Sequence, residues 1–362
     1  MVTVFMFPAY SLVARLTVAA IPDAALVASV AALSAIVATG TVVQLIRIGR
    51  RGAGMRRTVV ATAGAVALAG AAAAYSPATA KSPALADSTR ADAWSAMHGE
   101  AFAHAKYLAY ADQARVSRHM RAARAFTDAA ATELTDHFAR EADLIGFAPD
   151  NTTDLRDAIA GETGEATGLY PKMAARAAAA GDAAAAALLT EIAGDEAAHA
   201  RDFTAALMAV TTSDRVVSVP AGPVVVPVAI TPGPARVSAA TATDLRAAMA
   251  GEAFAHAKYL RYAQVAQRTG NPALGQLFTR TADVELREHF AAQADLAGLV
   301  SPDTRTNLTD AASGEAHEAD SMYPDYARQA DRAGDPQAAT LFREIGSDEK
   351  AHQRAFTAAA DR

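Results

Sequence analysis

The sequence predicts an all-α protein in which two tandem four-helix bundles follow an N-terminal hydrophobic segment. From about residue 87 onward, apolar residues recur three and four apart, and no stretch alternates as a strand would. The same part of the chain repeats itself, because GEAFAHAKYL at 99–108 recurs letter for letter at 251–260 and later landmarks recur 152 or 153 residues on. A period of this length indicates a duplicated domain rather than a solenoid repeat.

The first 86 residues have a different composition. An uncharged apolar run at 24–46 is long enough to cross a bilayer, five arginines follow between 47 and 57, and a second uncharged run covers 58–80. We expect a membrane anchor if both runs span the bilayer, or a cleavable secretory signal if Met55 is the true start. Both interpretations place the bundles on the outer side of the membrane. A single span at 24–46 would leave them on the cytoplasmic face.

The repeat defines the expected domains as 87–210 and 241–362. The segment between them, 211–240, is rich in valine and proline and suits an extended, semi-rigid linker. Each copy should contain four helices of about 25 residues with short joints, which favours an antiparallel bundle within each copy. The sequence leaves open whether the two bundles pair as a pseudo-dimer.

Composition excludes several kinds of site and partner. The chain has no cysteine, so it has no disulfide, no thiolate zinc site and no iron–sulfur cluster. It carries a net charge of −6 and a single Trp, and it shows no basic stripe, which argues against nucleic acid as a partner.

The strongest functional signal is the position of acidic residues on faces that should be buried. The apolar stripe of the last helix reads Phe342, Ile345, Glu349, His352, Phe356. Burying carboxylates costs several kcal/mol each unless cations neutralise them, and no Lys or Arg recurs on these stripes. Two divalent cations per bundle fit this set of ligands. The residues that interrupt the stripes are Glu100, Glu133, Glu162, Glu165, Glu196 and His199 in copy one, and Glu252, Glu285, Glu315, Glu318, Glu349 and His352 in copy two.

The second helix of each copy offers two candidate ligands. Glu133 is followed by Asp136 at +3 and His137 at +4, and Glu285 is followed in the same way by Glu288 and His289. Positions +3 and +4 share a helix face, and a one-residue π-bulge would bring the histidine into line. We therefore favour His137 and His289, with Asp136 and Glu288 as the alternatives.

The motifs GEAFAHAKYL, TADVELREHF, GEAHEADSMYPDYA and LFREIGSDEKAHQRAF resemble the four helices of the ferritin-like domain of rubrerythrins. The resemblance covers roughly 90–208 and 242–360. It implies that Glu133 and Glu196 bridge two irons in copy one, with Glu100 and Glu162 as terminal ligands and His199 bound to one iron. In copy two it assigns these roles to Glu285, Glu349, Glu252, Glu315 and His352. It also implies one extra carboxylate in each copy, Glu165 in copy one and Glu318 in copy two. Catalytic tyrosines should lie close to the irons, namely Tyr107, Tyr170, Tyr259 and Tyr323.

The resemblance implies a non-haem di-iron oxidoreductase that reduces peroxide or oxidises ferrous iron with dioxygen. Manganese is possible in place of iron, because carboxylate and imidazole accept either metal. Rubrerythrins proper carry a four-cysteine rubredoxin domain that this chain lacks, so an external electron donor is expected. The alternative is a non-catalytic module that sequesters iron and is tethered to the membrane or exported.

Overall fold

The computed structural model describes residues 85–212 and 218–360, and these residues contain helices and no strand, as the sequence predicts. Within them no helix is both long enough and apolar enough to cross a membrane. The runs at 24–46 and 58–80 lie outside the described residues.

Each copy folds into four consecutive helical rods, and π-helical segments interrupt the second and third rods. In copy one the rods are α4 (Asp87–Val116), then α5 (Met120–Thr132) with η3 (Glu133–His137) and α6 (Phe138–Ile145), then α7 (Asn151–Gly164) with η4 (Glu165–Leu169) and α8 (Tyr170–Ala179), then α9 (Ala183–Thr211). In copy two they are α10 (Ala239–Arg268), then α11 (Pro272–Val284) with η5 (Glu285–Phe290) and α12 (Ala291–Ala297), then α13 (Thr304–His317) with η6 (Glu318–Met322) and α14 (Tyr323–Ala333), then α15 (Pro336–Ala360).

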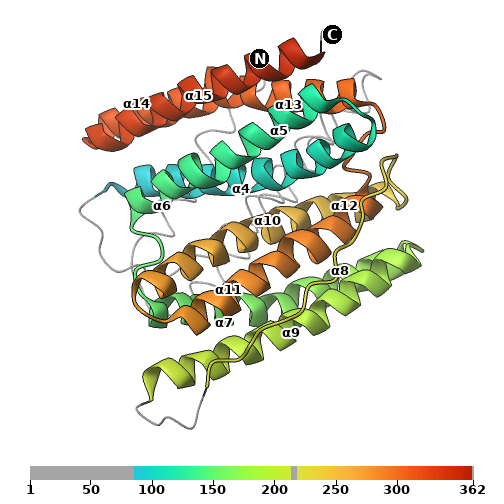
Figure 1. The fold of residues 1–362 in the computed structure, drawn as a ribbon, viewed down its shortest axis with the longest axis vertical. Helices are drawn as coiled ribbons and strands as arrows, with labels where there is room; N and C mark the ends of the chain where they lie inside the picture. The colour runs from blue at the N-terminus through green and yellow to red at the C-terminus, as the bar shows by residue number, and fades with distance from the viewer. Residues whose placement is uncertain (1–84, 213–217, 361–362) are drawn as a thin grey trace, which may run out of the picture. The chain divides into compact units, whose positions relative to one another are not determined.

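The two copies exchange halves. The first two rods of copy one pack against the last two rods of copy two, and α10, α11 and α12 pack in the same way with α7, α8 and α9. Figure 1 shows both groups, with α4 and α5 beside α13 and α15, and α10 and α11 beside α7 and α9. We call these groups bundle 1 and bundle 2. The expectation that each copy closes its own bundle is therefore corrected, because each bundle takes two rods from each copy.

A short joint explains the exchange. Ferritin-like bundles connect their second and third helices by a long crossover that returns along the bundle. Here residues 146–150 separate α6 from α7, and five residues span at most about 18 Å, whereas a 26-residue rod is about 39 Å long. Gly146 ends α6 in the left-handed conformation, and the Asp150 carboxylate caps α7 by accepting from the Thr152 and Thr153 amides. The chain therefore begins its third rod in the neighbouring bundle.

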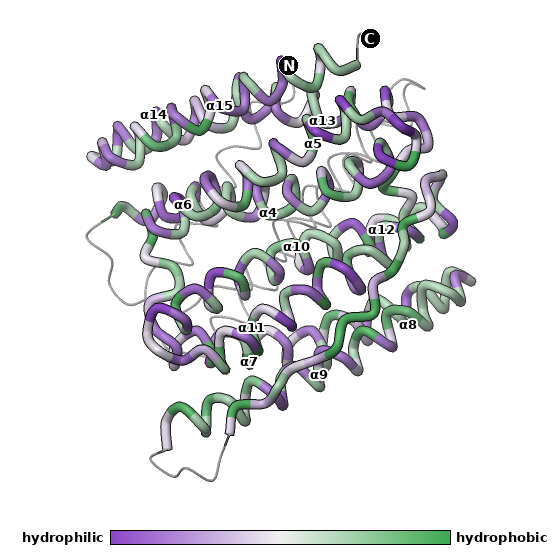
Figure 2. Tube along the Cα trace, viewed as in Figure 1, coloured by the Kyte–Doolittle hydropathy of each residue, from purple (hydrophilic) through white to green (hydrophobic). Residues whose placement is uncertain are grey.

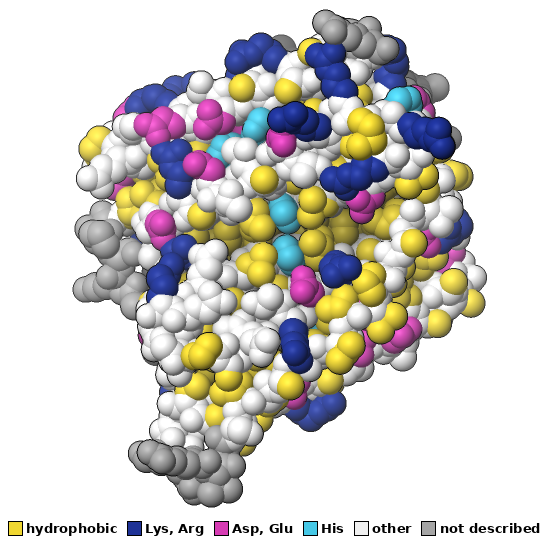
Figure 3. All heavy atoms as spheres, in the orientation of Figure 1, with side chains coloured by type: hydrophobic (Ala, Val, Ile, Leu, Met, Phe, Trp, Pro, Cys, Tyr) yellow, Lys and Arg dark blue, Asp and Glu magenta, His cyan; other side chains and the backbone are white. Residues whose placement is uncertain are grey.

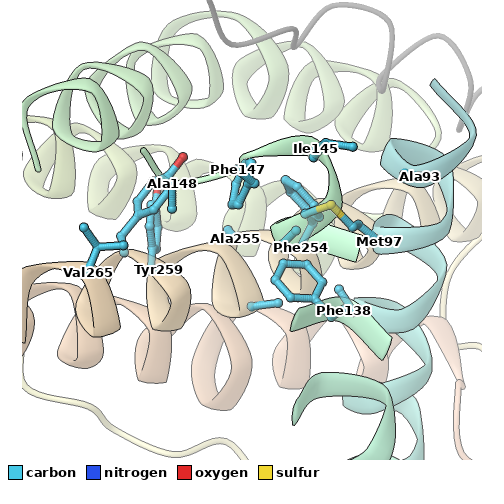
Figure 4. Close-up of a cluster of buried hydrophobic side chains, with 14 of the residues drawn as sticks. Ala93, Met97, Phe138, Ile145, Phe147, Ala148, Phe254, Ala255, Tyr259 and Val265 are labelled. Atoms are coloured by element: carbon cyan, nitrogen blue, oxygen red, sulfur yellow. The ribbon is translucent and has the colours of Figure 1, made fainter. Parts of the chain in front are cut away.

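An apolar cluster lies between α4, α6 and α10, where the bundles meet. Figure 4 shows Met97, Phe138, Phe147 and Phe254 pointing toward one another, and all four are buried. The Phe147 ring also stacks on Tyr262, with ring centroids 5.5 Å apart. Because this cluster draws side chains from both bundles, burying its apolar surface holds the two bundles together.

Residues 218–238, from the linker between the copies, form neither helix nor strand and lie along the second rod of copy two. We call this segment the strap. Its amides donate to the Arg287 and Val300 carbonyls, and Arg236 forms an ion pair with Asp295. Figure 2 shows the strap as an apolar stretch crossing the face of bundle 2 near α8, α9 and α11.

Gly298 should be the most sensitive position under the strap. Its φ is +62°, and an added Cβ would lie 2.3 Å from the Ala235 backbone nitrogen. We expect Gly298→Ala to lower the free energy of unfolding by about 2–4 kcal/mol, combining the cost of a left-handed alanine with overpacking. The matched control is Gly334→Ala, because Gly334 has φ +83° and no atom within 4 Å of the added Cβ. Urea unfolding of both variants measures the difference, and equal losses would mean that the strap does not press on this turn.

Candidate metal centres

Each bundle contains one cluster of buried acids and histidines. We call the two clusters centre 1 and centre 2. Within each, two four-residue groups share a pair of glutamates, and the ligand atoms of each group lie within 4.8 Å of one another. Centre 1 contains Glu100, Glu133, His137, Glu315, Glu349 and His352, and centre 2 contains Glu162, Glu196, His199, Glu252, Glu285 and His289.

In centre 1, two glutamates each reach both histidines. The His137 Nδ1 lies 2.8 Å from Glu133 Oε2 and 2.9 Å from Glu349 Oε1. The other oxygens of these two carboxylates lie 3.1 and 3.0 Å from the His352 Nδ1. The remaining glutamates each approach one histidine, since Glu100 lies 3.6 Å from His137 and Glu315 lies 3.6 Å from His352. The arrangement has the form of two shared and two terminal carboxylates.

Centre 2 repeats this geometry with the copies reversed. Glu196 and Glu285 are the shared pair, at 3.0 and 3.3 Å from the His199 Nδ1 and at 3.2 and 2.9 Å from the His289 Nδ1. Glu162 approaches His199 at 3.4 Å, and Glu252 approaches His289 at 3.7 Å. Every shared pair therefore joins one glutamate from each copy, whereas the sequence interpretation took both from one copy.

The donor atoms fit cations better than they fit the protein alone. The buried oxygens without a hydrogen-bond partner in the protein include both of Glu133 and one each of Glu162, Glu196, Glu285, Glu315 and Glu349. Burial raises the pKa of the Glu315 carboxyl to about 8, and the nearby Glu133 adds to the shift. Burial lowers the pKa of His352, but the adjacent carboxylates of Glu133, Glu315 and Glu349 outweigh it and raise the pKa to about 12. Unsatisfied buried carboxylates of this kind are costly unless charge is supplied among them.

The π-helical segments place the histidines of the second rods. η3 and η5 begin at Glu133 and Glu285, and the extra residue in each wide turn brings His137 and His289 onto the buried face. Both histidines are fully buried or nearly so. Asp136 instead pairs with Arg140 at 3.2 Å, and the Glu288 carboxylate accepts from the Val226 amide of the strap. Neither Asp136 nor Glu288 belongs to the four-residue groups of centre 1 or centre 2. Asp136 instead forms a separate group with His137 and Asp348.

The four tyrosines each donate to a terminal glutamate in the same bundle. Tyr323 donates to Glu100 and Tyr107 to Glu315 in centre 1, and Tyr170 donates to Glu252 and Tyr259 to Glu162 in centre 2. All four rings are buried. Burial and the adjacent carboxylates raise the pKa of Tyr107 and of Tyr323 well above the usual value, so both hydroxyls keep their protons.

Glu165 and Glu318 lie beside the centres but outside the ligand groups. Each begins a π-helical segment, and their Oε1 atoms lie 3.8 Å from where a Cβ would stand on Gly251 and Gly99. Burial raises the pKa of both carboxyls, and Glu196 and Glu349 respectively add to the shift. The structure brings the twelve other predicted ligands together and places these two at the margin.

Sequence reasoning missed a buried pair near the centres. Glu141 in α6 and its counterpart Gln293 in α12 are both fully buried. The Tyr323 hydroxyl donates to Glu141 at 3.0 Å, and the Gln293 amide donates to Glu252 at 3.0 Å. Glu141 continues the buried stripe of Glu133 and His137 at intervals of four, and this spacing could have revealed it.

The two centres differ in their access to solvent. A groove of about 330 Å³ between α5 and α15 reaches His352, with Arg121 and Arg124 in its wall. Figure 3 shows histidine and basic side chains at the surface over these helices. At centre 2 the strap covers the corresponding part of α11, where Gly222 lies against Leu277 and Arg280. The exposed side-chain fraction is 15% for His352 and 4% for His199.

Comparisons with known proteins agree with this geometry. The rubrerythrin family model matches the chain twice, at residues 94–207 and 244–360. Nigerythrin of Nitratidesulfovibrio vulgaris is 33% identical over 33% of this chain and 65% of its own length, and rubrerythrin of the same organism is 34% identical over 32% and 66%. Rubrerythrin of Clostridium perfringens is 32% identical over 32% and 67%. The matches thus span about two thirds of these relatives. No solved structure matches the chain significantly.

The family match covers most of both copies, including every residue of the two centres. The chain belongs to the rubrerythrin family of ferritin-like di-iron proteins.

Proposed function

We propose that centre 1 and centre 2 are carboxylate-bridged di-iron sites at which the protein reduces peroxide or oxidises ferrous iron. The observation that supports this most directly is the shared pair of glutamates in each centre, because each offers one oxygen toward each of two histidine-flanked positions. In centre 1, Glu133 and Glu349 would bridge, Glu100 and Glu315 would be terminal ligands, and His137 and His352 would each bind one iron. In centre 2, Glu196 and Glu285 would bridge, Glu162 and Glu252 would be terminal ligands, and His199 and His289 would each bind one iron.

When bound, a pair of ferrous ions would supply the two electrons that, with two protons, convert one hydrogen peroxide into two waters. The protein's contribution is to hold the ligands in place and to exclude water. The terminal glutamates are fixed by tyrosine hydroxyls, which leaves their second oxygens free to face the metal positions. Tyr107 and Tyr323 keep their protons because burial raises their pKa, so they act as hydrogen-bond donors to these ligands.

The groove between α5 and α15 gives small molecules a route to centre 1. His352, whose side chain is partly exposed, is among its lining residues, and its volume far exceeds that of peroxide or dioxygen. The electrons for repeated turnover would come from an external donor, because the chain has no cysteine for an iron–sulfur module.

Sequestration of iron without turnover is the alternative, and the covered surface over centre 2 favours it for that centre. We propose further, from the sequence of residues 1–86, that a membrane segment or export signal places the bundles on the outer side of the membrane.

Stopped-flow mixing of iron-loaded protein with peroxide and excess chemical reductant tests the catalytic proposal. We expect many turnovers per chain, and we expect Glu349→Ala to lower the rate at least tenfold at centre 1. The exposed Glu344→Ala, on the same helix, serves as the control. A single stoichiometric oxidation, with no further turnover in the presence of reductant, would support sequestration instead.

A further inference from the structure

One buried difference between the copies lies next to the two centres. Glu141 and Gln293 occupy equivalent places in α6 and α12, 152 residues apart, and the side chains have nearly the same shape. Both side chains are fully buried. Bulk water therefore does not screen the differences in charge and in hydrogen bonding between them.

Their hydrogen bonds to the terminal ligands are not equivalent. At centre 2 the Gln293 amide donates to Glu252 Oε1 at 3.0 Å and reaches the Tyr170 hydroxyl at 3.2 Å, so this carboxylate oxygen accepts from two donors. At centre 1, Glu141 accepts from Tyr323 at 3.0 Å, and its other oxygen has no partner in the protein. The Tyr323 hydroxyl therefore donates a bifurcated hydrogen bond to Glu141 and Glu100. Glu100 has no counterpart of the amide donor that Gln293 provides to Glu252.

We propose that this exchange makes the two centres electronically different, with Glu141 lowering the reduction potential of centre 1 relative to centre 2. The inference rests on the proposed di-iron function. Glu141 is a positioning residue, because it acts through Tyr323 and through its charge rather than by binding metal.

Both effects act in the same direction. Six carboxyl groups surround centre 1, counting Glu141 and Glu318, and five surround centre 2, counting Glu165. Burial raises the pKa of the Glu141 carboxyl in the metal-free protein, and the positive charge of bound iron opposes that shift. A Glu141 that is ionised beside the irons stabilises the ferric state over the ferrous state. A hydrogen bond donated to a ligand withdraws electron density from the metal, so the Gln293 amide favours the ferrous state at centre 2.

The lysines beside the two centres are matched, so they do not cancel this difference. Lys106 lies 3.2 Å from Asp310 beside centre 1, and Lys258 lies 3.3 Å from Asp157 beside centre 2, at equivalent positions. Centre 2 should therefore be reduced first as reductant is added, and centre 1 should be oxidised first.

A redox titration of the iron-loaded full chain tests the proposal, with Mössbauer spectroscopy to count ferrous iron and EPR to detect mixed-valent pairs. Each centre should give one reduction step, or wave, in the titration. Glu133→Ala and Glu285→Ala should each empty one centre, so the wave that each variant loses identifies the centre. We expect two waves in the unmodified protein. Glu141→Gln should raise the centre 1 wave so that the ferrous-to-ferric ratio at a fixed potential rises at least tenfold, or about 59 mV for one electron.

The reciprocal change provides the matched control. Gln293→Glu should lower the centre 2 wave by a similar amount, and it carries the test alone if Glu141→Gln does not fold. The double exchange should invert the order of the waves. The proposal would be overturned if, in protein with normal iron content, Glu141→Gln left the centre 1 wave unmoved or Gln293→Glu left the centre 2 wave unmoved. An unmoved centre 1 wave is also the result expected if Glu141 keeps its proton beside the irons.

Failure of the proposed function gives a different result. Two waves that respond to the exchange, in protein that shows no turnover with peroxide, would retain the inference about Glu141 and remove the catalytic assignment. A chain that binds no iron would remove both.

Discussion

A chain carrying both Glu133→Ala and Glu349→Ala is expected to lose the metal of one centre and to keep the other fully loaded. The two residues come from different copies, yet they are the shared glutamates of centre 1. Removing either deprives both metal positions of a ligand, so the second substitution has little metal left to remove. Metal analysis per chain should therefore show about half the iron of the unmodified protein.

The informative comparison is Glu133→Ala with Glu196→Ala. These residues belong to the same copy but to different centres, so this pair should remove nearly all the iron. Glu344→Ala again serves as the exposed control, and thermal unfolding checks that each variant is folded. If each copy closed its own bundle, the two double variants would exchange results.

The ligands of the centres could be predicted because they break a regular pattern. Glu349 and His352 stand on a stripe of Phe342, Ile345 and Phe356 that is buried in the structure, so their inward orientation followed from helical periodicity alone. A π-bulge that would bring His137 and His289 into line was one of the two alternatives that the sequence left open, and the structure contains it as η3 and η5.

The exchange of halves could not be predicted from the ligand pattern. The two copies carry the same ligands at the same heights, so either pairing of halves satisfies the carboxylates and histidines equally well. The length of the joint between the second and third rods was the signal, since residues 146–150 are too few to return along a bundle. Glu141 escaped notice because the repeat directed attention to acids present in both copies, and its counterpart is Gln293.

Metal-free and iron-loaded protein should depend on pH in opposite ways. In the metal-free protein, burial raises the pKa of Glu252 to about 7 and that of Glu315 to about 8. An unfolded glutamate releases its proton near pH 4.3, so above that pH the folded protein holds protons that the unfolded chain has lost. Stability therefore falls as the pH rises from about 4.3 to about 8.

The histidines reinforce this direction. Hydrogen bonds to glutamates raise the pKa of His352 to about 12 although burial opposes the shift, so its contribution is complete below about pH 6.5 and declines above it. Glu349 acts oppositely, because the adjacent imidazoles of His137 and His352 lower its pKa to about 2 although burial opposes the shift. Its contribution is present above about pH 4.3 and is lost only as the pH falls toward 2, below the range of interest.

Iron reverses the slope because the metal binds deprotonated carboxylates and neutral imidazole, so protons compete with it. Urea unfolding between pH 5 and 8 should show the metal-free protein losing on the order of 1 kcal/mol per pH unit for each responsible group and the iron-loaded protein gaining stability. Glu252→Gln with Glu315→Gln should flatten the metal-free curve, because glutamine has no proton to retain. Parallel curves for the two forms would mean that the buried carboxylates are already neutralised within the protein, and the case for a cation cluster would then lose its electrostatic basis.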